Sequence, residues 1–326
     1  MYTNERFPSI KHQSYQAMIR RLPKSHPSYQ RLLNKKSIED SGLHGEMYFD
    51  QVASKLLSPT CLHLKNSLLT LFKETFQVDS IIITPYFILI SEIKNMVGNL
   101  IFDKKGGSLT RMLNGQKEYF TCPLFQVSRH TECVEYLLNQ LNISVPVIDQ
   151  VIYTNQYVEF TVKDSEIDIY EKILRIEQFT YHYRKIIKNY PHKHLTETQI
   201  KFIYQTLLQR NVLPFWNNHL TLLGISRDEI IKGFICLECN NIAETAYGGW
   251  RCHTCRKRVD HMFYQNMIDY FLLSGYTAKS SDLKDFLAMS SNRQVLTYIN
   301  KIDIQSEMVG RQRIFFSPIH AKSTFE

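Results

Sequence analysis

Apolar residues recur at two spacings along this chain, and the spacing separates expected strands from expected helices. Between positions 77 and 94, two short apolar runs joined at Thr84-Pro85 predict a pair of strands, because neighbouring strand residues point to opposite faces of a sheet. Asp79 opens the first run, and Glu92 and Lys94 close the second. Glu92 and Lys94 should share a face, so the pattern brings three charged side chains to one edge of an apolar sheet.

Helical spacing flanks these expected strands on both sides. Upstream, the sequence from Ser41 to Glu46 opens an apolar pattern of roughly helical period, which would place Glu46 in the first turn of a helix. Downstream, residues 122–130 lead into a second helical pattern, in which Gln126 and His130 share a face. Helices and strands are therefore expected to alternate in this part of the chain.

The chain then continues with the same mixture of elements. Residues 147–163 are expected to add strands that close the sheet, whereas residues 166–190 return to a helical period. Thr196 is expected to cap a further helix over residues 199–210. No internal repeat is visible in the sequence.

The C-terminal part reads as three helices and a hairpin. A first helix ends at Ser274-Gly275, Ser280-Ser281 can cap a second, and residues 293–299 form a third. Residues 304–316 predict two strands around Gly310. This order resembles a winged helix-turn-helix, in which the third helix enters the major groove and the wing contacts the DNA backbone.

In a winged-helix arrangement, specific polar residues would contact nucleic acid. Asn292 and Arg293 would face the nucleic acid from the third helix, and Arg311 and Arg313 would contact it from the wing. Small three-helix units also serve as protein-docking modules. A dimerising or protein-binding role is therefore the alternative for this segment.

Two Cys-x-x-Cys pairs, Cys236 with Cys239 and Cys252 with Cys255, are separated by 12 residues. This spacing fits a four-thiolate zinc site, which leaves no open coordination position and is therefore structural. The intervening Tyr247-Gly248-Gly249-Trp250 suits the turn of a short hairpin. Coincidental pairs or two disulfides are the alternatives.

The charges at the edge of the first sheet suggest a specific chemistry. Unpaired charges are costly to bury, so charged groups at such a place usually belong to a site that uses them. Asp79 and Glu92 can hold a hard divalent cation, Lys94 can orient an attacking water, and Glu46 is available as a third carboxylate. The set suits metal-assisted hydrolysis of phosphodiesters. The alternative is a hairpin of which only the apolar middle is buried.

The order Gly-Glu, Asp, Glu-x-Lys and Pro-x-x-Gln-x-x-x-His resembles the nuclease-related domain (NERD), a branch of the PD-(D/E)xK nuclease superfamily. The resemblance covers roughly residues 15–145, and it is most specific from Asp79 to Lys94. It implies an α/β fold with a restriction-endonuclease-like αβββαβ core and a metal-dependent nuclease that uses Mg²⁺ or Mn²⁺. Ser80 is a departure, because many relatives carry a histidine after the aspartate.

The same resemblance implies roles for individual residues. Glu46, Asp79 and Glu92 would be the acids on the metal side, with Asp79 and Glu92 as ligands. Lys94 would orient water or stabilise charge, and Gln126 would be an accessory residue of the catalytic site.

Composition adds the distribution of charge. The chain has 326 residues and a net charge of +8, and residues 1–36 hold eight basic residues against Glu5 alone. This segment could bind phosphate or lie as a solvated arm on the domain surface. The sequence has no apolar run of membrane-spanning length and no signal-peptide core, and its cysteine usage favours a reducing compartment. We therefore expect a cytoplasmic protein.

These patterns predict five segments: a basic N-terminal segment (1–36), a nuclease-like domain (37–163), a helical connector (164–230), a zinc ribbon (231–260) and a winged-helix-like domain (261–318). The expected function is cleavage of nucleic acid, most simply DNA, in DNA processing or in defence against foreign DNA. A non-catalytic DNA-binding or regulatory protein is the first alternative. A scaffold that binds a protein partner or a second copy through the C-terminal modules is the other.

Overall fold

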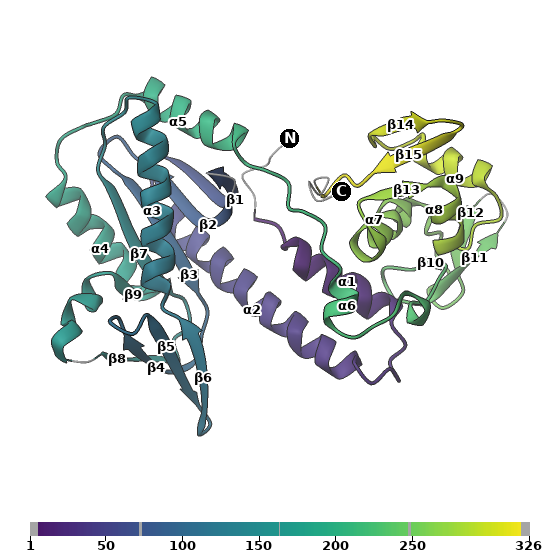
Figure 1. Ribbon diagram of the computed structural model, residues 1–326, viewed down its shortest axis with the longest axis horizontal. Helices are drawn as coiled ribbons and strands as arrows, with labels where there is room; N and C mark the ends of the chain where they lie inside the picture. Colours follow the sequence, from purple (N-terminus) through teal and green to yellow (C-terminus); the bar gives the residue numbers. More distant parts are fainter. Residues whose placement is uncertain (1–5, 72–73, 163, 247–248, 321–326) are drawn as a thin grey trace. The chain divides into compact units, whose positions relative to one another are not determined.

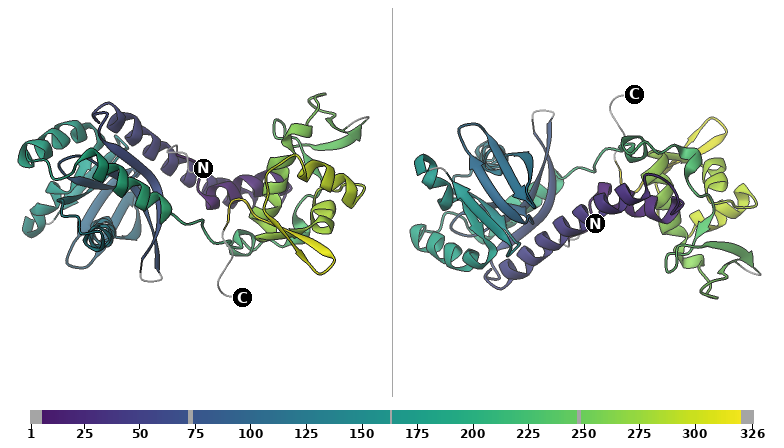
Figure 2. Two further views of the ribbon diagram at one scale, coloured as in Figure 1. Left: turned by 90° about the horizontal axis from the view of Figure 1, so that it is seen from above. Right: turned by 90° about the horizontal axis from the view of Figure 1, so that it is seen from below.

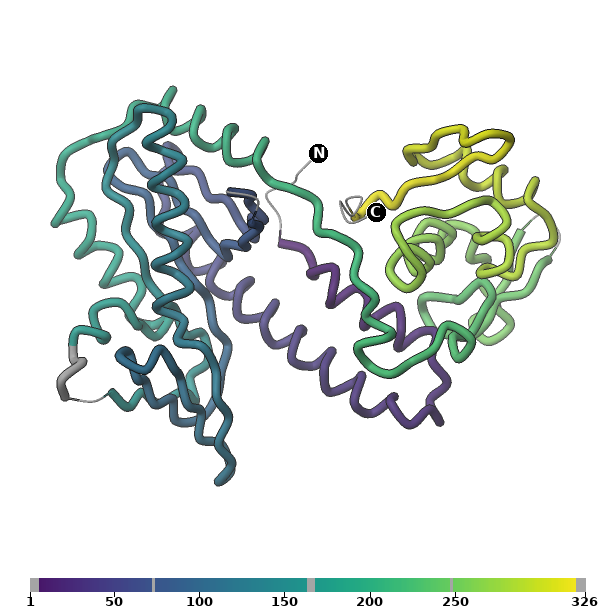
Figure 3. The backbone as a smooth tube through the Cα atoms, in the orientation of Figure 1, coloured from purple at the N-terminus to yellow at the C-terminus, as the bar shows by residue number. Residues whose placement is uncertain are grey.

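The computed structural model describes residues 6–71, 74–162, 164–246 and 249–320, and it divides into two compact units (Figure 1). Unit 1 contains residues 1–7 and 41–212, and unit 2 contains residues 8–40 and 213–326. The chain passes from unit 2 into unit 1 inside one long helix, α2 (Tyr29–Ser54), which can be followed in Figure 3. Within the described segments, no helix is both long and apolar enough to cross a membrane.

The centre of unit 1 is a five-stranded mixed sheet with strand order β1-β2-β3-β7-β9. Strand β2 runs antiparallel to its neighbours β1 and β3, whereas β3, β7 and β9 run parallel. The strands are β1 (Leu62–Leu71), β2 (Glu74–Ile83), β3 (Ile88–Lys94), β7 (Val147–Tyr153) and β9 (Ile173–Arg175). The apolar runs in β2 and β3 follow from their position, because a sheet covered on both faces needs apolar residues on both.

Helices cover both faces of this sheet, and the view from above separates them (Figure 2). Helices α3 (Pro123–Gln140) and α5 (Glu197–Gln209) share a core with Ile81, whereas α2 and α4 (Ile176–Asn189) share a core with Ile82. Consecutive residues of β2 thus belong to different cores, as strand alternation requires. The expected cap of α5 is confirmed, because the side-chain oxygen of Thr196 accepts the amide of Gln199.

A second sheet, with order β6-β5-β4-β8, follows β3 in unit 1. It comprises β4 (Gly98–Asp103), β5 (Ser108–Leu113), β6 (Gln116–Thr121) and β8 (Val158–Val162), and a 3-10 segment (Asp164–Glu171) precedes β9. The sequence analysis did not anticipate β4 to β6. Strand β6 is exposed along its whole length, so it carries no alternation between buried and exposed residues that could reveal a strand.

Unit 2 combines short helices with two three-stranded sheets of order β10-β11-β12 and β13-β15-β14. Its elements are α1 (Ile10–Arg21), the first turns of α2, α6 (His219–Leu222), a 3-10 turn (Arg227–Glu229), β10 (Phe234–Ile235), β11 (Ile242–Ala246), β12 (Gly249–Cys252), a second 3-10 turn (Asp260–Met262), α7 (Phe263–Ser274), β13 (Thr277–Lys279), α8 (Ser280–Phe286), α9 (Asn292–Ile299), β14 (Ser306–Val309) and β15 (Gln312–Phe316). One apolar core contains Met18 of α1, Phe271 of α7 and Phe315 of β15.

The expected mixed α/β class is confirmed, but the expected place of Glu46 is wrong. Helix α2 begins at Tyr29, so Glu46 lies in its interior and not in its first turn. The glycine before Glu46 does not start the helix. A Cβ on Gly45 would come within 2.5 Å of Thr154 Oγ1 and 2.7 Å of Asn95 Cβ. Glycine at this position therefore lets the helix approach the ends of β3 and β7 closely.

The structure groups the chain differently from the five segments proposed from the sequence. Residues 8–40 join residues 213–326, and the proposed connector contributes β9 and two helices to unit 1. Residues 8–40 join residues 213–326 in part because the guanidinium groups of Arg20 and Arg21 both bond to Asp269 of α7. These two residues are thus part of the core of unit 2, and neither belongs to a solvated basic arm.

Asp269 and Arg21 form a buried ion pair in which both side chains are 0% exposed. Arg21 Nε donates to Asp269 Oδ2 at 2.9 Å, and its Nη2 donates to Asn266 Oδ1 at 2.7 Å. Breaking such a pair leaves a buried charge without its partner. Asp269→Ala should therefore destabilise unit 2 by about 3–5 kcal/mol.

Urea unfolding followed by tryptophan fluorescence measures this loss selectively, because both tryptophans, Trp216 and Trp250, belong to unit 2. Glu238→Ala is the matched control, since it breaks an exposed pair with Lys257 and should change stability by no more than about 1 kcal/mol. Equal effects of the two substitutions would contradict the proposed role of Asp269.

Candidate functional site

The candidate site lies where β2 and β3 separate. The two strands pair as far as Ser80 and Ser91, and Asp79 and Glu92 are the next residues on each strand. Beyond the paired segment, the backbone N–H of Ile93 donates to Asp79 Oδ2 at 2.9 Å. The Asp79 side chain thus takes the place of a strand partner, which explains how this carboxylate can be only 8% exposed.

Glu92 and Lys94 lie on the same face of β3, as the alternation predicts. Lys94 Nζ donates to Glu92 Oε1 at 2.6 Å and to Gln126 Oε1 of α3 at 3.3 Å. The Lys94 side chain is 29% exposed, whereas that of Glu92 is 2% exposed. The lysine therefore connects a buried carboxylate to the solvent-accessible edge of the sheet.

Glu46 approaches from α2 on the other side of the sheet and is held by Arg6. Arg6 Nη1 donates to Glu46 Oε2 at 2.8 Å. The same guanidinium donates to Asp50 through Nε and Nη2, at 2.9 and 3.0 Å, and to the main-chain oxygen of Asp79 at 2.9 Å. Glu46 and Asp50 are four positions apart on α2, which places both carboxylates on one face of the helix.

The carboxylates of this region interact electrostatically. Burial, followed by the charge of Asp79, raises the pKa of Glu46 to about 7 and that of Glu92 to about 7. Burial also raises the pKa of Asp79, although the Ile93 amide and the charge of Lys94 oppose this effect. The three acids are therefore mutually repelling groups in a poorly solvated place, which a cation would stabilise in their charged form.

Glu92 has one oxygen without a hydrogen-bond partner. Glu92 Oε2 and His130 Nδ1 are both buried and unsatisfied, and they lie 3.7 Å apart. Burial, with the charges of Arg129 and Lys94, lowers the pKa of His130 to about 4. The His130 ring stacks on the Phe76 ring, with 5.6 Å between the ring centroids. A neutral imidazole does not compensate the charge of Glu92, which leaves Oε2 open to a cation.

Arg6, Asp50 and His63 also belong to this region, although no sequence pattern singled them out. His63 Nε2 lies 2.8 Å from the Oγ of Ser80, the residue that departs from the family pattern, and 4.0 Å from Asp50 Oδ1. Helical spacing from Glu46 could have indicated Asp50. Arg6 and His63 carried no local signal, because their contacts arise only when distant segments meet.

Four of the predicted residues meet closely enough to form a metal site by themselves. The ligand atoms of Cys236, Cys239, Cys252 and Cys255 lie within 4.8 Å of one another. Among the described residues, Glu46, Asp79 and Glu92 do not form a cluster this tight. They nevertheless interact electrostatically, because the charge of Asp79 raises the pKa of both Glu46 and Glu92.

The cysteine cluster is built by two similar turns. Each Cys-x-x-Cys pair is followed by a residue with positive φ, Asn240 at 58° and Arg256 at 56°, which reverses the chain beside the sulfurs. Cys236 follows β10, and Cys252 ends β12. None of these cysteines forms a disulfide, so the four-cysteine cluster fits a structural zinc ion. Tyr247 and Gly248 of the expected hairpin turn lie outside the described residues.

The predicted nucleic-acid-binding residues lie in the C-terminal part of unit 2. Asn292 and Arg293 begin α9, and Arg311 and Arg313 lie at the turn between β14 and β15 and in β15. All four side chains are exposed. They remain predicted contacts, because exposure alone does not identify a binding partner.

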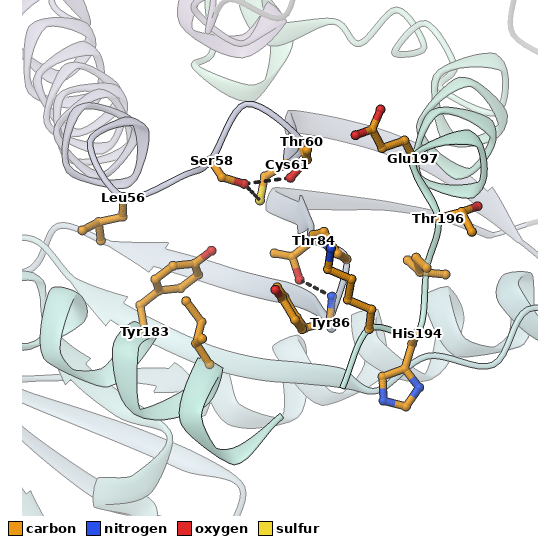
Figure 4. A pocket seen from close by; sticks show the side chains of 14 residues that line it. Leu56, Ser58, Thr60, Cys61, Thr84, Tyr86, Tyr183, His194, Thr196 and Glu197 are labelled. Carbon is orange, nitrogen blue, oxygen red and sulfur yellow. Dashed lines mark hydrogen bonds between the residues drawn. The ribbon is translucent and has the colours of Figure 1, made fainter. Parts of the chain in front are cut away.

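A cavity of about 590 Å³ lies at the other end of β2 and β3, beside the Thr84-Pro85 turn (Figure 4). Its lining includes Cys61, Tyr183 of α4, Lys193 and His194. Its lining does not include Asp79, Glu92 or Lys94. The cavity is therefore separate from the candidate site.

Comparison with known proteins assigns part of the chain to a described family. Residues 41–155 match the family model described as Nuclease-related domain, and Glu46, Asp79, Glu92, Lys94 and Gln126 all lie within this range. An uncharacterized protein of Bacillus anthracis is 25% identical over 174 residues, which cover 53% of this chain and 77% of that protein. No solved structure matches the chain significantly. Residues 41–155 of this chain therefore form a nuclease-related domain.

Proposed function

We propose that this protein is a metal-dependent nuclease that hydrolyses phosphodiester bonds, most simply in DNA. The observation that carries the proposal is the Glu92–Lys94 pair beside Asp79, inside the nuclease-related domain. Lys94 contacts Glu92 at 2.6 Å, while the other oxygen of Glu92 is buried without a partner. A scaffold without catalysis would have no evident use for this arrangement at a sheet edge.

The order of elements in unit 1 supports the proposed restriction-endonuclease-like αβββαβ core. Helix α2 is followed by the antiparallel strands β1, β2 and β3, then by α3 and the parallel strand β7. Strands β4 to β6 are inserted between β3 and α3. In this proposal the insertion does not disturb the site, because Gln126 still reaches Lys94 from the first turns of α3.

Asp79 and Glu92 are suited to bind Mg²⁺ or Mn²⁺, with Glu46 supporting the metal shell. The unpartnered Glu92 Oε2 fits this role, because hard cations take carboxylate oxygens with free lone pairs. When bound, such an ion would polarise the scissile phosphate and favour ionisation of the attacking water. The chain itself would supply orientation and the remaining positive charge.

Lys94 would orient the attacking water and offset negative charge that develops on the phosphate. Its bonds to Glu92 and Gln126 restrict the ammonium group to the sheet edge, so little reorganisation is needed when substrate binds. Gln126 would be an accessory residue that holds Lys94 from α3. His130 would remain neutral beside Glu92 and exclude water from that side.

Unit 2 would bring the nuclease to its substrate. The cysteine cluster would be a zinc ribbon, and α7 to β15 would be a winged helix-turn-helix-like domain with the hairpin β14–β15 as its wing. The exposed Asn292, Arg293, Arg311 and Arg313 would contact DNA. By analogy of domains, the process would be DNA processing or defence against foreign DNA.

Removal of a catalytic charge should slow cleavage strongly. Asp79→Asn, Glu92→Gln and Lys94→Ala should each slow Mg²⁺-dependent cleavage by roughly 100- to 1000-fold, because each removes a metal ligand or an electrostatic stabiliser. Linear, circular and single-stranded DNA should be tested with and without Mg²⁺. The controls are Glu177→Gln and Lys188→Ala, exposed residues of α4. Wild-type cleavage by a folded Asp79→Asn protein would refute the assignment.

Zinc should be present in the purified protein. We expect about one zinc ion per chain, because an all-cysteine site of four thiolates binds a single ion. Cys239→Ser should lower the zinc content and destabilise unit 2 more than unit 1, whereas Cys133→Ser on α3 should do neither. Elemental analysis together with thermal unfolding tests this, and zinc-free protein that resists chelators would contradict it.

DNA binding and cleavage should be separable. Replacing Arg293, Arg311 and Arg313 by alanine should weaken DNA binding and flatten its dependence on salt, because fewer phosphates are neutralised. Cleavage at saturating DNA should be nearly unchanged, since the proposed catalytic residues belong to unit 1. The matched control is an alanine triple variant of the exposed Arg184, Lys185 and Lys188 of α4. Unaltered affinity and slope would instead favour a protein-docking role.

A further inference from the structure

Arg6 divides the acidic region into two parts. Both carboxylate oxygens of Asp50 and one oxygen of Glu46 accept hydrogen bonds from its guanidinium group. The Arg6 side chain is only 2% exposed, so these bonds are shielded from competing water. A charge-assisted, partly bidentate contact of this kind is among the strong hydrogen bonds of proteins. Three of the four carboxylate oxygens on this side are therefore already bonded to a cation.

The oxygens on the other side are less fully used. Asp79 accepts the Ile93 amide through Oδ2, and Glu92 accepts the Lys94 ammonium through Oε1. Glu92 Oε2 is buried and has no hydrogen-bond partner. A divalent cation needs carboxylate oxygens with available lone pairs. The available oxygens therefore point to the Asp79–Glu92 side of the region.

The charge balance agrees with this division. The region contains four carboxylates and three cations. The carboxylates are those of Glu46, Asp50, Asp79 and Glu92, and the cations are Arg6, Lys65 and Lys94. One negative charge remains when all seven groups are ionised. Binding of one divalent ion would change the net charge of these groups from −1 to +1. A second ion would raise it to +3 and add strong repulsion in a poorly solvated place.

We propose that Arg6 is a fixed cation that takes the place of a second metal ion, so that the site binds one divalent ion, at Asp79 and Glu92. This inference rests on the metal-dependent nuclease function proposed above. Two-metal sites hold their ions about 3.5–4 Å apart, and an ion beside Asp50 would have to displace the guanidinium. Arg6 is also a positioning residue, because its bond to Glu46 keeps that carboxylate near Asp79.

Counting the Mn²⁺ ions bound to the zinc-loaded chain of 326 residues tests the proposal. Isothermal titration and electron paramagnetic resonance of free Mn²⁺ give the number of tight sites without any measurement of activity. The wild-type protein should bind about one Mn²⁺ tightly. The double variant Asp79→Asn, Glu92→Gln should bind no Mn²⁺ tightly, because both carboxylate ligands are removed. Arg6→Gln should raise the number to about two, because Glu46 and Asp50 become free ligands.

Two further variants keep the result interpretable. Arg6→Lys retains the positive charge and should stay at about one tight ion, since electrostatic exclusion does not need the guanidinium geometry. Arg184→Gln, an exposed residue of α4, removes one positive charge elsewhere and should leave the number unchanged. Two tight ions in the wild-type protein, or one in a folded Arg6→Gln protein, would overturn the proposal. The wild-type number decides the matter even if Arg6→Gln does not fold.

Failure of this inference is distinguishable from failure of the proposed function. A wild-type protein that cleaves DNA with two tight Mn²⁺ ions would remain a nuclease but would refute the role of Arg6. A protein that binds no Mn²⁺ and cleaves no substrate would refute both. Cleavage with one tight ion, and a second ion gained only in Arg6→Gln, would support both.

Discussion

The separation of β2 from β3 beyond Ser80 and Ser91 is the constraint on which the candidate site depends. Where two strands part inside a covered sheet, the freed backbone groups and side chains have no water to satisfy them. Asp79 compensates for this locally by accepting the amide of Ile93. Its buried charge then requires cations, and Lys94 and Arg6 supply them from the two sides of the sheet. The same charged contacts therefore stabilise this edge of the sheet and form the candidate site.

The placements that the sequence predicted correctly share a local signal. Glu92 and Lys94 are two positions apart in a strand, so alternation alone places them on one face. The four cysteines are two short pairs whose spacing predicts a common site, and their sulfurs do converge. In both cases the geometry that matters is decided within a few residues. Glu92 and Lys94 also lie within residues 41–155, which match the nuclease-related domain.

The residues that the sequence did not reveal depend on distant contacts. Arg6 is 73 positions from the Asp79 carbonyl that it contacts, and no local pattern links the two. Glu46 was misplaced because Gly42 and Gly45 look like the start of a helix, whereas Gly45 instead allows α2 to approach Thr154. Arg20 and Arg21 look like surface charges until Asp269 of α7 is brought against them. Tertiary packing overrides the local reading at these positions.

The pairing of Arg21 with Asp269 also affects when the ion pair can form during synthesis. These residues are 248 positions apart in the chain, and a ribosome adds about 5–20 residues per second. Helix α1 must therefore wait on the order of 10–50 s for its charged partner during synthesis. Residues 41–212 of unit 1 are completed within this interval. Arg21 of α1 therefore stays without the partner of its native ion pair while residues 41–212 of unit 1 are synthesised.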